Sequence, residues 1–164
     1  MPTLSNRRTK LLQHLAQHGS VSVAEDLHLP HPPLLRAIGH TVNSLYNHPL
    51  IGGQASHVDR AAHAQQFFEG EFSALAKAHL TEKKGGEWHA TPQVVGYFKA
   101  GKKLGIAHSR ILDLVASGNG SVGIGHLKAD ELGQHYTTQD IEQAVSDLQQ
   151  LGVITGTRAS LKLR

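Results

Sequence analysis

Apolar residues recur every three or four positions along most of the chain, the spacing of one face of an α-helix. The first such stretch has Leu11, Leu12 and Leu15 on its apolar face and ends at Gly19, where glycine is a typical helix stop. The pattern therefore predicts an opening helix within residues 5–18.

Residues 19–38 predict a short helix, a tight turn and a second helix. Val23, Ala24 and Leu27 lie on one helical face. The proline-rich segment 30–33 then breaks that helix and suits the first turn of the next one. Such a helix-turn-helix places side chains in a DNA major groove, although a helical hairpin in an ordinary core has the same spacing. The apolar side chains expected to face inward from the second helix are Leu34, Leu35, Ile38, Val42 and Leu45.

The middle of the chain begins with a long alanine-rich stretch from Ser56 to Leu80. Its apolar face is too broad to remain uncovered, so we expect this helix to pack on a second copy of the chain or within its own. A linker over residues 83–86 and a short helix over residues 92–102 follow. The lysines Lys99, Lys102 and Lys103 cluster there, which is usually a solvated face but can contact a phosphate beside a DNA-binding unit.

The last segment repeats the first in outline. Two short helices precede a third one that is capped within residues 136–138, and residues 152–155 and 160–163 alternate as strands do. A helix followed by such a hairpin is common in winged-helix domains. Arg158, Lys162 and Arg164 on the hairpin allow contact with a DNA backbone. The residues expected to face outward from the third helix are polar and partly acidic, which is unfavourable next to phosphates: Gln139, Glu142, Gln143, Ser146, Asp147 and Gln149.

These elements predict a mainly α-helical fold with small β-wings. They also predict tandem winged helix-turn-helix domains that are joined by the long helix. The predicted domains are an N-terminal winged helix-turn-helix over residues 1–53, linking and dimerisation helices over residues 54–104, and a C-terminal winged helix over residues 105–164.

Charge favours the first two thirds of the chain for DNA contact. The net charge is +3; residues 1–53 and 54–104 each have an excess of two basic side chains, whereas residues 105–164 have an excess of one acidic side chain. Phosphate binding depends on Lys and Arg that release counterions.

Composition limits the other classes of function. The chain has no cysteine, which excludes a disulfide framework and fits a reducing cytoplasm, and no apolar run reaches the ~20 residues that a membrane span needs. No phosphate-binding glycine loop, paired catalytic carboxylates or nucleophile elbow occurs, so we expect no enzyme and no cofactor. The 13 histidines are scattered and only His14 and His18 share a helix face, so no metal site is predicted.

Ten residues within the segment 19–38 match, without a gap, the pattern of the N-terminal winged helix of LysR-type regulators, which this segment resembles. They are Gly19, Ser20, Ala24, Glu25, Leu27, His28, Pro32, Leu34, Arg36 and Ile38. Residues 43–51 are similar to the related molybdate-responsive (ModE-type) DNA-binding domain, in which a Pro-Leu-Val strand follows the helix. The likeness covers about residues 6–80. It departs at Leu35, where LysR-type proteins usually carry a DNA-contacting serine, and at Gly52-Gly53, where they carry a basic wing residue.

The resemblance implies that the helix starting near His31 enters the major groove and that the long helix pairs two chains. Arg7, Arg8 and Lys10 would add non-specific attraction to phosphates. The residues that meet bases or phosphates would be His31, Pro32, Leu35 and Arg36, with Ser20, Ser22, His40 and Asn43 beside them. The dimerisation residues would be Phe68, Phe72 and Leu75.

We therefore expect a sequence-specific, duplex-DNA-binding transcriptional regulator that acts as a homodimer in the cytoplasm, with room for a protein partner at the C-terminal winged helix. The 60 residues after position 104 are too few for the ligand-binding domain of either resembled family, so no small-molecule effector is expected. Two alternatives remain open. One is a plasmid or phage replication or partition protein that binds repeated sites; the other is an adaptor whose winged helices bind protein.

Overall fold

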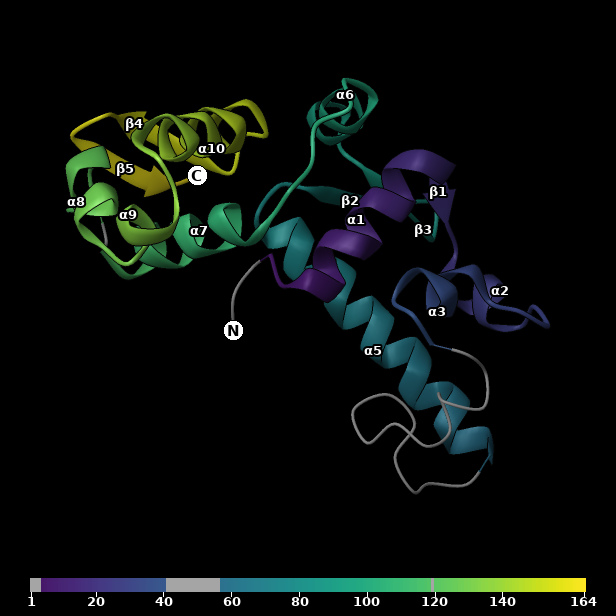
Figure 1. The fold of residues 1–164 in the computed structure, drawn as a ribbon. Coiled ribbons are helices and arrows are strands. Elements are labelled where there is room, and N and C mark those ends of the chain that lie inside the picture. Colours follow the sequence, from purple (N-terminus) through teal and green to yellow (C-terminus); the bar gives the residue numbers. More distant parts are fainter. Residues whose placement is uncertain (1–3, 41–56, 119) are drawn as a thin grey trace.

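The computed structural model describes residues 4–40, 57–118 and 120–164. Its described part consists of helices and two small antiparallel sheets (Figure 1). The mainly helical class with small sheets is thereby confirmed. Several expectations lie outside the described residues: the inward-facing Val42 and Leu45, the DNA contact of Asn43, and the short strand over residues 49–51 before Gly52-Gly53.

The N-terminal elements follow the predicted order. Helix α1 (Asn6–His18) leads into strand β1 (Ser20–Val21), helix α2 (Val23–Leu27) and helix α3 (Pro33–Ala37). Helix α1 is capped by the Ser5 side chain, which accepts a hydrogen bond from the backbone N–H of Arg8. Helix α3 is shorter than expected, because the chain leaves the helical conformation at Ile38.

The hairpin that completes this first unit lies much later in the chain than expected. After helix α5 (His57–Lys77), strands β2 (Thr81–Lys84) and β3 (Glu87–Ala90) form a hairpin. Strand β3 also pairs with β1, so the sheet has the order β1-β3-β2. The turn uses Gly85 and Gly86, both at positive φ, a conformation that hairpin turns need and glycine tolerates. The prediction of a linker over residues 83–86 was therefore wrong.

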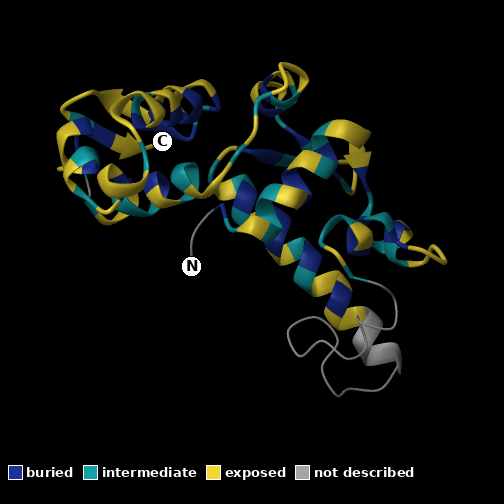
Figure 2. Cartoon of the chain, viewed as in Figure 1, coloured by how far each residue is buried: buried dark blue, intermediate teal, exposed yellow. Residues whose placement is uncertain are grey.

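The long helix α5 buries its apolar face inside its own chain. Buried and exposed positions alternate along the helix (Figure 2). Phe68, Phe72 and Leu75 are fully buried, and the Phe72 ring stacks on Trp88 of β3 with centroids 5.7 Å apart. These three side chains are not available to pair two chains, so dimerisation through them is corrected in favour of packing within one chain.

The C-terminal unit repeats the order of the elements that the structure describes in the first unit. Helix α6 (Pro92–Lys99) connects to helix α7 (Ile106–Gly118), which is followed by α8 (Ile124–Ala129), α9 (Leu132–His135) and α10 (Thr138–Gln150). Strands β4 (Ile154–Thr157) and β5 (Ser160–Leu163) then form a hairpin. Leu161 of β5 pairs with Val122, just before α8, as β3 pairs with β1 in the first unit.

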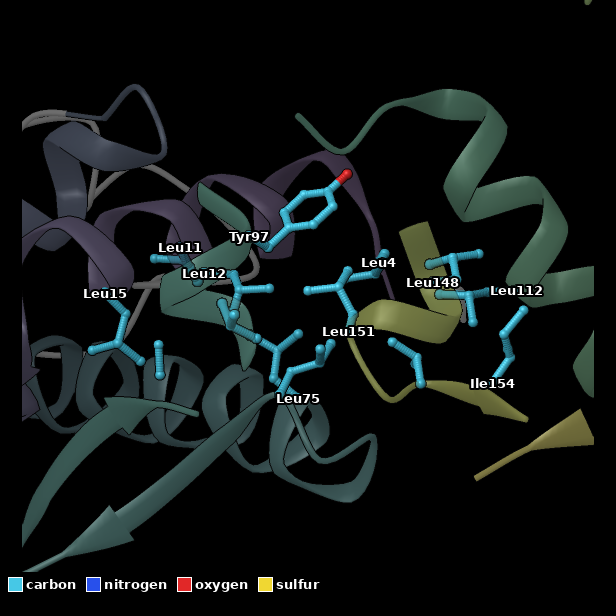
Figure 3. Packing of buried hydrophobic residues seen from close by; sticks show 14 of the residues in the cluster. Leu4, Leu11, Leu12, Leu15, Leu75, Tyr97, Leu112, Leu148, Leu151 and Ile154 are labelled. Carbon is cyan, nitrogen blue, oxygen red and sulfur yellow. The ribbon is translucent and has the colours of Figure 1, made fainter. Parts of the chain in front are cut away.

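One apolar cluster runs through both units. Figure 3 shows Leu11 and Leu15 of α1 at one end of a series of side chains, Leu75 and Leu151 near its middle, and Leu148 and Leu112 of the second unit at the other end. The two units are therefore packed on each other.

We predict that Phe72→Ala lowers the free energy of unfolding by about 3–5 kcal/mol, because it opens a cavity under Trp88. Urea denaturation measures the loss, and sedimentation at several concentrations measures the oligomeric state. The variant should keep the oligomeric state of the wild type; dissociation of a wild-type dimer on this substitution would show that Phe72 pairs two chains after all.

Candidate nucleic-acid interface

The helix-turn-helix region surrounds a hollow of about 680 Å³. Three of the predicted DNA-contacting residues, Ser20, Ser22 and Arg36, line it. Arg36 is exposed on α3 and has no ion-pair partner among the described residues. The structure thus brings these three side chains together around one concave surface.

Asp26 holds the turn between α2 and α3. Its carboxylate Oδ1 accepts a hydrogen bond from the backbone N–H of Leu34, 3.2 Å away, in the first turn of α3. Burial raises the pKa of Asp26, and the bond from Leu34 opposes that rise. A buried carboxylate that satisfies an otherwise unpaired helix N–H fixes the angle between the two helices.

Two histidines at the end of α1 form another wall of the same hollow. The rings of His14 and His18 have centroids 4.3 Å apart. Burial lowers the pKa of His14, and the nearby charges of His18 and Arg36 lower it further. The Arg36 guanidinium and these two imidazole rings line this part of the hollow, whereas Glu25, Asp26 and Glu87 line other parts of it.

The remaining predicted contact residues lie in different environments. His31 is exposed and His40 is half-buried. Pro32 is buried, and Leu35 is 0% exposed in the core, so these two side chains do not reach the surface. The prediction of a DNA contact from Leu35 is corrected: helical spacing places it on the inner face of α3 beside Leu34.

Arg7 and Arg8 bind a carboxylate of the same chain. The Nε atoms of Arg7 and Arg8 lie 3.4 Å and 3.2 Å from Oε2 of Glu71 on α5. Glu71 is buried, so the two arginines fasten α1 to α5. Lys10, the third residue predicted to attract phosphates, is exposed.

The β2–β3 hairpin adds a basic element that the sequence interpretation missed. Lys84 is exposed near the turn and lies 3.0 Å from Glu82. Lys83 lies on the other face, 3.1 Å from Glu69 and over the Trp88 ring. The signal was present, because two glycines between two alternating stretches predict a hairpin turn.

The hairpin borders the hollow. Lys84 pairs in register with Glu87, and Glu87 lines the hollow. Side chains at paired positions lie on the same face of a sheet. The exposed Lys84 is therefore at the edge of the surface that carries Arg36.

Asp147 of α10 was expected on the outer face of that helix, and the structure corrects this. It is buried, with its carboxylate 3.0 Å from Nε2 of His108 and 3.0 Å from the Gln143 amide nitrogen. Tyr97 of α6 and Lys102 also approach it. Burial tends to raise the pKa of Asp147, but the hydrogen bonds from His108 and Gln143 and the charge of Lys102 hold it below its usual value.

The same cluster explains why Lys102 is not a free phosphate ligand. Its Nζ lies 2.7 Å from Oε1 of Gln150 and 3.6 Å from Asp147. The Tyr97 hydroxyl donates to the backbone carbonyl of Lys103 at 2.7 Å. Together these contacts connect α6 and the following segment to α10, and so help to set the orientation of the two units.

Comparison with known proteins gives no relative. No family model matches the chain, and neither the curated proteins nor the solved structures contain a significant match. Within the described ranges, no helix is long and apolar enough to cross a membrane, and no three His, Asp or Glu side chains gather as metal ligands.

We predict that Asp147→Asn lowers the free energy of unfolding at pH 7 by about 1.5–3 kcal/mol, the usual contribution of hydrogen bonds to a charged group. Because its folded pKa is lowered, the carboxylate stabilises the fold above its unfolded pKa of about 3.9, and this stabilisation is lost as the pH falls through the folded value. Wild-type stability should therefore decline more steeply below about pH 4 than that of the variant.

Urea denaturation at a series of pH values measures both effects. Asp113→Asn is the matched control, since Asp113 lies on α7 of the same unit and has no ion pair among the described residues. Parallel stability curves for wild type and Asp147→Asn would contradict the prediction.

Proposed function

We propose that the protein is a sequence-specific regulator, built from two winged-helix units, that binds duplex DNA through the first of them. The observation that carries this proposal is the repeated topology. In each unit a helix is followed by a short strand contact and further helices, and then by a hairpin whose last strand returns to the short contact. Two helices joined by a turn, followed by a hairpin, form the winged version of the helix-turn-helix that docks on duplex DNA.

The first unit presents suitable chemistry for this purpose. The Arg36 guanidinium can donate two parallel hydrogen bonds to guanine or to a phosphate, and Ser20 and Ser22 beside it can bond phosphate oxygens. Glu25 and Glu87 repel phosphates from the interior of the hollow. We therefore assign the DNA contacts to its cationic edge, from Arg36 to the hairpin.

The topology also provides a second groove helix for this unit. Helix α5 precedes the hairpin of the first unit, as α10 precedes that of the second. The exposed positions along the described part of α5 are small, polar or basic: Ala62, His63, Gln65, Gln66, Gly70, Ser73 and Lys77. We assign sequence reading to α3 because Arg36 lies there, and the effect of substituting Arg36 distinguishes the two helices.

Selection from a random pool of duplexes with the purified protein tests the proposal. We expect enrichment of a defined sequence and an affinity that falls with salt concentration, because phosphate contacts release counterions. Enrichment of iterated sites would point to a replication or partition protein. The absence of any salt-dependent affinity would contradict DNA binding and favour an adaptor.

We predict that Arg36→Ala weakens binding to the selected sequence by about 1–3 kcal/mol and relaxes preference at one base position. Fluorescence anisotropy with selected and scrambled duplexes measures both changes. The exposed position of Arg36 makes a folding defect unexpected, and thermal unfolding checks this. If affinity is unchanged and Gln66→Ala reduces it instead, α5 is the groove helix.

We predict a different signature for Lys84→Ala. A phosphate contact carries no sequence information, so selected and scrambled duplexes should lose affinity to a similar extent. The slope of log affinity against log salt should decrease in magnitude by about one. An unchanged slope would show that the hairpin of the first unit does not contact the backbone.

A further inference from the structure

We infer that α10 and the β4–β5 hairpin form a second surface for duplex DNA, with α10 in the major groove. This inference rests on the proposed function. It assigns DNA binding to the C-terminal unit, although the sequence of that unit has an excess of one acidic side chain. The evidence is the pairing of the charged side chains on and around α10.

The outward face of α10 is polar and uncharged over most of its length. Ile141, Ala144 and Leu148 face the core, and Asp147 is buried in the contact with α6 and α7. Asp140 caps the helix, with its carboxylate accepting from the backbone N–H of Thr137. The exposed positions that remain are polar and uncharged: Thr138, Gln139, Gln143, Ser146, Gln149 and Gln150.

Glu142 is the other acidic residue of this helix, and two cations neutralise it. Its Oε1 lies 2.6 Å from Nη2 of Arg158 and 3.1 Å from Nζ of Lys128. The hydrogen bond from Arg158, and then that from Lys128, lowers the pKa of Glu142. The three groups together carry one excess positive charge, and Arg158 in the hairpin turn has a side chain 70% exposed.

This surface fits DNA better than a protein partner. A glutamine amide can pair with the donor and acceptor of adenine in the major groove, and an arginine can bind a phosphate. Protein interfaces are anchored by large apolar or aromatic side chains. In the described part of the chain the exposed large apolar residues are Leu29, Ile106 and Leu163. Of these only Leu163, the last residue of β5, belongs to this surface, and it lies at the end of the hairpin away from the turn.

Two substitutions in the full-length protein test the surface. Gln139→Ala should weaken binding to the pool-selected duplex at least about fivefold, which corresponds to the lower limit for a bidentate base contact. Arg158→Ala should reduce the magnitude of the salt slope by about one. Gln134→Ala is the matched control, because Gln134 is an exposed glutamine of α9 in the same unit, and it should leave affinity unchanged.

A photo-cross-linking residue at position 139, compared with one at position 134, gives a readout that does not depend on stability. A cross-link to labelled duplex from position 139 alone supports the inference. If the selected duplex is bound and Arg36→Ala weakens it, while position 139 neither cross-links nor affects affinity, the second surface is refuted and the proposed function stands. If no duplex is bound at all, both are refuted.

Discussion

A short β-contact beside the first helix closes each unit, and the placement of the other elements depends on it. Strand β1 has two residues, yet its pairing with β3 brings the distant hairpin beside α1 and encloses Val21 and Trp88 over α5. Such long-range closure costs chain entropy, which the burial of these apolar side chains offsets. In the second unit Val122 pairs with Leu161, and the next residue, Gly123, is crossed closely by the hairpin. A Cβ there would lie 2.7 Å from the carbonyl oxygen of Ala159.

The pairing of the short strand contact with the hairpin fixes only the two ends of each unit. The helix that precedes the hairpin can therefore differ in length between the two units. Helix α5 has 21 residues where α10 has 13, although both directly precede a hairpin. The last 13 residues of α5 carry Glu71, which binds Arg7 and Arg8, and Glu69, which accepts a hydrogen bond from the Trp88 indole N–H at 2.8 Å. Helix α5 thus holds α1 and β3 of the first unit together. Its side chains Phe68 and Phe72 are accordingly buried within one chain.

Local elements of this fold could be predicted from the sequence, whereas long-range pairings could not. The stop at Gly19, the capping Thr137 and the apolar faces of α1 and α10 depend on neighbouring residues, so their helices were predicted correctly. The partner of β1 could not be predicted, because a two-residue strand has no periodicity. Its partner β3 also comes only after α5 in the sequence. Arg36 was predicted to contact DNA, and the structure places it on the exposed face of α3. Helical spacing indicated the inner position of Leu35, whereas the resemblance to LysR-type proteins predicted a DNA contact for the same residue.

The charge of a segment is a poor measure of its surface when carboxylates are shared or buried. Two of the four basic residues within positions 1–53 are bound to Glu71, so the first unit offers phosphates less free positive charge than its sequence suggests. In the second unit Asp147 is buried among donors and Glu142 lies between two cations, so the acidic excess of residues 105–164 is largely absent from the outer face of α10. The electrostatic contrast between the two units is thus smaller at their surfaces than in their sequences.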